Sequence, residues 1–244
     1  MKLNNKGFAV TTIMYMILVM GMILIILILS MLSSRRLILE KSKQDALNNI
    51  KELPTIYQEV EYIESSGTQY ILTDIIPDNI TGTKLTISVT NTEGDQLFFG
   101  SRSSTDGRFW NGQNSTKLYF AWNTRPSTTD RITITQKEKF TISSNYFNDK
   151  KNIYNGTDHS DITTTLAANS HPIAIFATND NGTIRYHSSI RLYNFKITRE
   201  DVLFANFIPC YRLSDNVIGL YDLVNNKFYT NQGEGTFNKG KNIY

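Results

Sequence analysis

The chain has 244 residues, with 25 Lys and Arg, 22 Asp and Glu, and a formal net charge of +3. The positive excess lies in residues 1–53, which hold seven basic and three acidic residues, so residues 54–244 hold 18 basic and 19 acidic ones. Such a nearly neutral segment lacks the overall positive charge of a nucleic-acid-binding domain, which argues against nucleic acid as a partner. The only cysteine, Cys210, excludes an intrachain disulfide and a thiolate metal cluster, and its context FIPCY predicts a buried strand position.

The first predicted element is a membrane-spanning helix over residues 8–34. No charged residue occurs between Gly7 and Ser34, and 25 helical residues extend about 37 Å, enough to cross a hydrocarbon layer of about 30 Å. A buried helix of a soluble protein would keep a polar stripe, and a cleavable secretory signal would have a shorter apolar core. A single-pass anchor is therefore favoured over both alternatives.

The start of the chain, MKLNNKG followed by FAVTTIMYMILVMGMILIIL, resembles a type IV prepilin. The resemblance implies that residues 1–7 are a leader, that a prepilin peptidase cuts between Gly7 and Phe8, and that Phe8 is then N-methylated. The family usually has Glu at the fifth mature position, where this chain has Thr12. The resemblance therefore favours a minor pilin-like component or a plain anchored protein over a major pilin, with other pilin-like subunits as partners.

Residues 35–53 are predicted to continue the helix as a stalk. Leu39, Ala46, Leu47 and Ile50 fall near helical spacing among charges of both signs, and Pro54 closes the segment. The leader motif and the character of the following segment place residues 54–244 outside the cell.

From Pro54 onward, short alternating runs rich in Thr, Tyr, Ile and Phe are separated by turn dipeptides such as Asn155-Gly156 and Asn181-Gly182. This pattern predicts a β-sandwich or barrel. The expected strands cover residues 57–64, 69–74, 84–90, 96–101, 117–122, 131–136, 139–144, 171–178, 189–198, 217–223 and 227–231.

The segments LPTIYQEVEYIESSGTQYILTDIIP and NFIPCYRLSDNVIGLYDLVNNKFYTNQGEGTF resemble a concanavalin A-like or laminin G-like domain of bacterial and phage surface proteins. The resemblance implies an all-β jelly-roll sandwich over residues 54–244, in a superfamily that includes lectins, adhesion modules and glycanases. It implies no cofactor. Laminin G-like domains sometimes hold calcium, which Asp95, Asp106, Asp130 and Asp158 could bind here.

The strongest enzymatic pattern is Glu59-x-Glu61-x-x-Glu64, which resembles the E-x-D-x-x-E strand of retaining jelly-roll glycanases. Two carboxyl groups about 5–5.5 Å apart would suit a retaining mechanism. Alternating acidic residues on a first strand also describe an edge strand with a solvated face. We prefer the structural interpretation and predict no catalytic residue.

The predicted ligand site is aromatic and polar. Sugars bind by stacking on aromatic rings while amides and guanidinium groups reach their hydroxyls. The alternative is that the tryptophans belong to the core. The predicted ligand-binding residues are Arg102, Trp110, Asn111, Tyr119, Trp122 and Asn123.

The sequence thus predicts a non-catalytic, lectin-like adhesion protein, held in the cell membrane by one span and presenting its jelly-roll domain outside. A minor pilin or pseudopilin-like component of a filament or secretion system is the second hypothesis. Glycan hydrolysis by Glu59 and Glu64 is the third.

Overall fold

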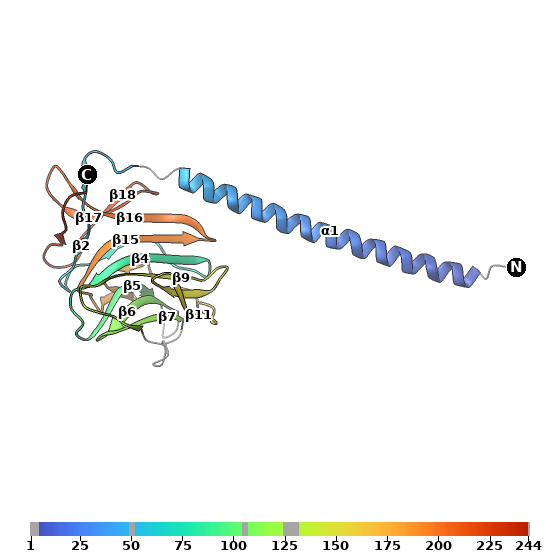
Figure 1. Ribbon diagram of the computed structural model, residues 1–244, viewed down its shortest axis with the longest axis horizontal. Helices are drawn as coiled ribbons and strands as arrows, with labels where there is room; N and C mark the ends of the chain where they lie inside the picture. The colour runs from blue at the N-terminus through green and yellow to red at the C-terminus, as the bar shows by residue number, and fades with distance from the viewer. Residues whose placement is uncertain (1–4, 49–51, 104–106, 124–131, 244) are drawn as a thin grey trace. The chain divides into compact units, whose positions relative to one another are not determined.

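The computed structural model describes residues 5–48, 52–103, 107–123 and 132–243, and the side chains of the N-terminal helix from residue 12 to 38 and at 41. The chain divides into two compact units, Met1–Asp45 and Ala46–Tyr244. The first is a helix and the second is an all-β domain (Figure 1).

The helix α1 runs without a break from Asn5 to Asn48. Its segment Thr12–Ile38 has a mean hydropathy of 2.9 and buries none of its side chains against the protein, so it is long and apolar enough to span a membrane. The predicted stalk extends too far, because residues 52 and 53 are not helical. Leu53 instead packs beside Tyr57 against a small cluster that contains Cys210, which shows tertiary packing overriding helical periodicity.

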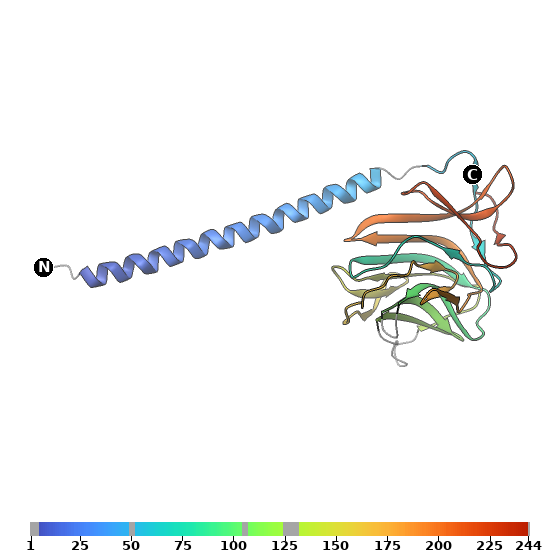
Figure 2. The ribbon, with the colours of Figure 1, turned by 180° about the vertical axis from the view of Figure 1, so that it is seen from behind.

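The all-β domain consists of two sheets, which confirms the predicted sandwich (Figures 1 and 2). The larger sheet contains β1 (Tyr57–Glu59), β2 (Ile63–Glu64), β4 (Thr81–Val89), β9 (Lys139–Asn145), β10 (Lys151–Tyr154), β11 (Thr157–Asp161), β15 (Ile190–Arg199), β16 (Val202–Arg212), β17 (Ile218–Asp222), β18 (Lys227–Thr230) and β19 (Asn238–Lys239). Its main path is β11-β10-β9-β4-β15-β16-β17-β18.

The smaller sheet follows the order β14-β13-β5-β6-β7-β8, with β3 and β12 joined beside β5. Its strands are β3 (Ile71–Leu72), β5 (Asp95–Arg102), β6 (Arg108–Asn114), β7 (Lys117–Asn123), β8 (Ile132–Thr133), β12 (Ala174–Ile175), β13 (Thr178–Asp180) and β14 (Thr183–Arg185).

The core forms between the two sheets because apolar residues alternate toward it on the long strands. Leu85, Ile87, Phe195 and Phe207 from the larger sheet join one cluster with Phe99 and other residues of the smaller sheet. Cys210 is fully buried as predicted, and burial raises the pKa of its thiol to about 12. This thiol is therefore a packed apolar group rather than a nucleophile.

Turn chemistry fixes the hairpins. Asn155-Gly156 joins β10 to β11 and Asn181-Gly182 joins β13 to β14, and all four residues have positive φ. Two-residue turns of this kind match the twist of the strands that they join. The strand β6 was not among the strands that the sequence predicted. Gly112 lies within its ladder, where a Cβ would stand 2.4 Å from the carbonyl oxygen of Gln96.

Candidate functional site

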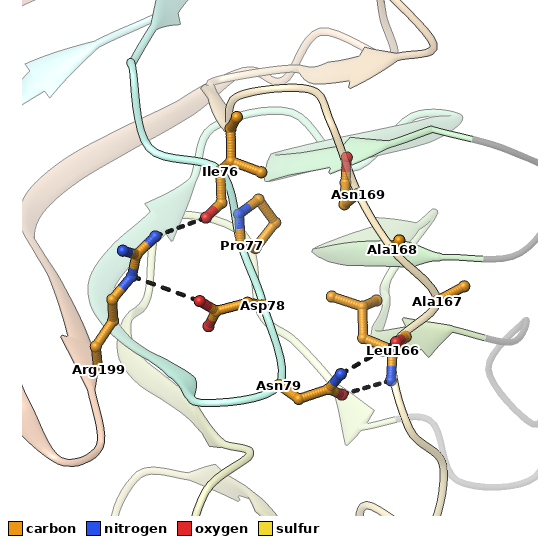
Figure 3. A pocket seen from close by; sticks show the side chains of 9 residues that line it. All are labelled: Ile76, Pro77, Asp78, Asn79, Leu166, Ala167, Ala168, Asn169 and Arg199. Atoms are coloured by element: carbon orange, nitrogen blue, oxygen red, sulfur yellow. Dashed lines mark hydrogen bonds and ion pairs between the residues drawn. The ribbon is translucent and has the colours of Figure 1, made fainter.

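A pocket of about 370 Å³ lies between two loops of the all-β domain. One wall is the segment 76–79, which precedes β4, and the other is the segment 166–169, which follows β11 (Figure 3). The lining is mixed: Ile76, Pro77, Leu166, Ala167 and Ala168 supply apolar surface, while Asp78, Asn79, Asn169 and Arg199 supply polar groups. The volume lies at the lower end of the range of small-molecule sites, and the described residues that line the pocket include no aromatic one.

The two walls are tied to each other at one end of the pocket. The side chain of Asn79 donates to the carbonyl oxygen of Leu166 at 3.2 Å and accepts from its amide nitrogen at 2.7 Å. Asn79 thereby pairs with the backbone of a residue 87 positions away, as a neighbouring strand would. These two hydrogen bonds join the loops and fix the distance between them at this end of the pocket.

The hairpin between β15 and β16 fixes the other side of the pocket. The guanidinium of Arg199 donates to the carbonyl oxygen of Ile76 at 2.8 Å, and the amide nitrogen of Glu200 donates to the carbonyl oxygen of Ile80 at 2.9 Å. Both residues of the turn, Glu200 and Asp201, have positive φ although neither is glycine. Left-handed backbone is costly for such side chains and is often found beside functional sites.

The polar pair of the pocket is Asp78 and Arg199. Arg199 Nε stands 3.9 Å from Asp78 Oδ2, beyond hydrogen-bond distance, and the two side chains are 32% and 46% exposed for Arg199 and Asp78. Asp78 Oδ1 is occupied, since it accepts from the amide nitrogen of Ile80 and from the hydroxyl of Thr81. Asp78 Oδ2 faces Arg199 and can accept a hydrogen bond from a ligand hydroxyl (Figure 3).

The segment 166–169 is anchored to the smaller sheet. Asn123 accepts hydrogen bonds from the amide nitrogens of Gly107 and Ala167, both at 2.9 Å. Asn169 donates to the hydroxyl of Ser101 at 2.9 Å and accepts from that of Ser103. The side chain of Asn123 thus helps to hold the pocket wall, and its contact with a ligand stays a prediction.

Three of the sequence-predicted site residues lie together on the outer face of the smaller sheet. The guanidinium of Arg102 is 5.8 Å from the ring centre of Trp110, and Tyr119 packs beside that ring. Trp110 is only 9% exposed, and its indole nitrogen has no hydrogen-bond partner in the described part of the chain. Arg102 is also paired with Asp180 at 2.6 Å. Contact of these three residues with a ligand stays a prediction.

Trp122 and Asn111 lie elsewhere, on the inner face of the same sheet. Trp122 belongs to the main core and stacks on Tyr146 with ring centres 3.2 Å apart. Asn111 is fully buried, opposite Phe99 on β5 and Phe120 on β7. The strand alternation that carries Phe109 into the core carries both of these residues with it, so their prediction as ligand-binding residues is corrected to a structural role.

Glu59 and Glu64 of the glycanase-like pattern lie on β1 and β2, two short consecutive strands of the larger sheet. Glu59 lies on β1 opposite Cys210, and burial raises the pKa of its carboxyl group. Glu64 lies on β2 opposite Arg191, with which it forms an ion pair at 2.6 Å. Glu64 is thus engaged by a cation and stabilises the larger sheet.

The predicted calcium ligands do not converge in the part that the structure describes. Asp95 bonds to Asn114 and Asp158 bonds to Lys151, while Asp106 and Asp130 lie outside the described residues. Across the described ranges, no group of three or more His, Cys, Asp and Glu side chains could hold a metal ion.

No known protein-family model matches the chain, and no curated protein matches it. Among solved structures, it resembles the CBM40 domain of the Ruminococcus gnavus IT-sialidase, at a TM-score of 0.43 and 18% identity, over 60% of this chain and 92% of that one. The same domain bound to alpha2,3 sialyllactose gives a TM-score of 0.43 at 15% identity, with the same coverage. A mutant NanB sialidase of Streptococcus pneumoniae gives 0.38 at 15% identity, over 57% of this chain and 26% of that one. Likenesses this distant assign no function to the chain.

Proposed function

We propose that this chain is a membrane-anchored, non-catalytic protein of the cell surface whose β-sandwich binds a glycan in the pocket between segments 76–79 and 166–169. The helix α1 supplies the anchor, and the pocket supplies the binding site. The proposal depends on the pocket and not on the distant structural likenesses.

The observation that carries the proposal is the Asp78–Arg199 pair beside an apolar wall. The two charged groups stand 3.9 Å apart without a hydrogen bond, at the edge of a pocket whose remaining lining includes Pro77, Leu166 and Ala168. A sugar presents hydroxyls that both donate and accept, together with an apolar C–H face. The carboxylate and guanidinium match the hydroxyls, and the apolar wall matches the C–H face.

Filling the pocket should abolish binding. Ala168 is exposed and lines the pocket, so Ala168→Phe places a large side chain in the cavity without burying new bulk in the core. We expect the full chain in detergent micelles to bind one class of glycan on a glycan array, and Ala168→Phe to lose at least about tenfold in affinity, the equivalent of about 1.4 kcal/mol. Asp78→Asn should also weaken binding. The substitution keeps an oxygen at the position of Oδ1 but replaces Oδ2, the oxygen proposed to accept from the ligand, with an amide nitrogen.

Thr163→Phe is the matched control, since Thr163 is exposed on the same connecting segment but does not line the pocket. Its affinity should equal that of the unmodified chain. If Ala168→Phe binds as tightly as Thr163→Phe while both remain folded, the pocket is not the glycan site.

The N-terminus of α1 supports a second candidate function, that of a pilin-like component. Gly7 and Phe8 lie within a helix that is continuous for 44 residues, which is the form of a pilin-like helix. We expect the chain purified from its native host to have the mass of residues 8–244 plus one methyl group. An intact Met1 by mass spectrometry would contradict prepilin processing and leave a plain membrane anchor.

A further inference from the structure

The charges of the all-β domain are segregated, although its net charge is close to zero. The neighbouring strands β4, β9 and β15 together contain five Lys and Arg residues and no Asp or Glu (Figure 1). Arg199 faces the pocket, and the other four are Lys84, Lys139, Arg191 and Lys196. We call these four residues the basic face. The net charge of residues 54–244 therefore conceals a local positive field.

Two members of the basic face stand directly opposite each other. Lys84 on β4 and Lys196 on β15 are register partners, so their Cβ atoms are about 4.5–5.5 Å apart. Neither has an ion pair with any residue in the described part of the chain. Like charges in this position destabilise a sheet. An anion held between the two ammonium groups would relieve that repulsion.

The other two cations share a row with Ser88. Arg191 and Lys139 are the register partners of Ser88 on its two sides, and Arg191 is also paired with Glu64 of β2. Ser88 is four residues from Lys84, which at about 3.4 Å per residue places the two rows of cations about 14 Å apart. The basic face thus offers two positively charged rows about 14 Å apart, a distance that a short chain of linked sugars can span.

The surface between the two rows carries hydroxyl, amide and aromatic groups. Thr86 bonds to Thr141 across the strands at 3.1 Å, and Asn194 is the register partner of Thr86. Tyr193 lies beneath the ammonium group of Lys139, 4.0 Å from its ring centre, and meets Tyr62 edge-on at 5.4 Å. Hydroxyls, an amide and tyrosine rings between cations favour a polymer of sugars that carry acidic groups.

We propose that the basic face binds an acidic polysaccharide, separately from the pocket. One acidic group of the polymer lies between Lys84 and Lys196, and a second reaches Lys139, because Arg191 is already paired with Glu64. This binding weakens as salt is added, because the contacts are between charges at the surface.

The test compares two charge-matched double variants of the full chain in neutral detergent micelles. Lys84→Gln with Lys196→Gln removes the opposed pair, while Lys117→Gln with Lys241→Gln removes two exposed lysines elsewhere. The probes are polygalacturonate and neutral dextran. We expect the unmodified chain and the control to bind polygalacturonate equally, the first variant to bind at least tenfold more weakly, and no chain to bind dextran.

The same variants give a second readout that does not depend on the choice of polymer. Removing the opposed ammonium groups should raise the midpoint of thermal unfolding, whereas the control variant should not. Equal affinities of the two double variants for polygalacturonate would overturn the proposal, whatever their unfolding midpoints. Binding of vesicles rich in phosphatidylglycerol, with none of polygalacturonate, would also overturn it and assign the basic face to lipid. Neither result bears on the pocket, which Ala168→Phe tests separately.

Discussion

Replacing Trp122 with Ala should lower the free energy of unfolding by about 3–5 kcal/mol, the range found when a buried Trp or Phe is truncated. The ring of Trp122 is 6% exposed, stacks on Tyr146 and meets Phe109 edge-on at 4.9 Å. Its loss leaves a cavity between the sheets that these neighbours cannot fill. Urea unfolding of the full chain in detergent, followed by the β-sheet circular dichroism signal, measures the change.

Tyr186→Ala is the aromatic control, because Tyr186 is 46% exposed. Its effect should stay within about 0.5 kcal/mol, as for most surface substitutions. If Trp122→Ala lowered the free energy of unfolding no more than Tyr186→Ala, Trp122 would not be a core residue. The hypothesis that it contacts a ligand would then be favoured again.

Asp222→Ala should destabilise the chain by about 3–5 kcal/mol, because it removes a buried acceptor. The carboxylate of Asp222 is fully buried and accepts from the amide nitrogens of Asn206 and Val224, both at 3.0 Å, and from the side chain of Asn225 at 2.6 Å. Each buried donor left without a partner costs about 1–3 kcal/mol. The same urea experiment measures the loss.

Asp215 provides the matched control for Asp222. Its carboxylate is 42% exposed and pairs with Arg212 three positions away at 2.7 Å. Asp215→Ala should cost less than about 1 kcal/mol, as exposed ion pairs contribute little. Equal losses from the two substitutions would show that the carboxylate of Asp222 does not stabilise the turn between β17 and β18.

The fold was predictable where local patterns and tertiary packing agree. The alternation in SIRLYNFKIT became β15 as predicted, and Asn155-Gly156 and Asn181-Gly182 became two-residue turns. Strand prediction failed where the local sequence does not show which side chains face the core. The strand β6 lacks a clear apolar alternation, because Asn111 and Gln113 point inward while Trp110 points outward.

The pocket could not be found from the sequence. Its walls come from segments 76–79 and 166–169, whose contact depends on the pairing of Asn79 with Leu166. Nothing local to either segment signals the other. The basic face was partly visible, since β4, β9 and β15 contain no acidic residue, but only the register shows that Lys84 and Lys196 are opposed.

The most direct test of glycan binding is to locate the sugar in a structure of the full chain bound to the glycan that the array selects. The prediction is a sugar ring against Pro77 and Leu166, with one hydroxyl bonded to Asp78. A sugar bound only against Trp110, or only at another place outside the pocket, would contradict it.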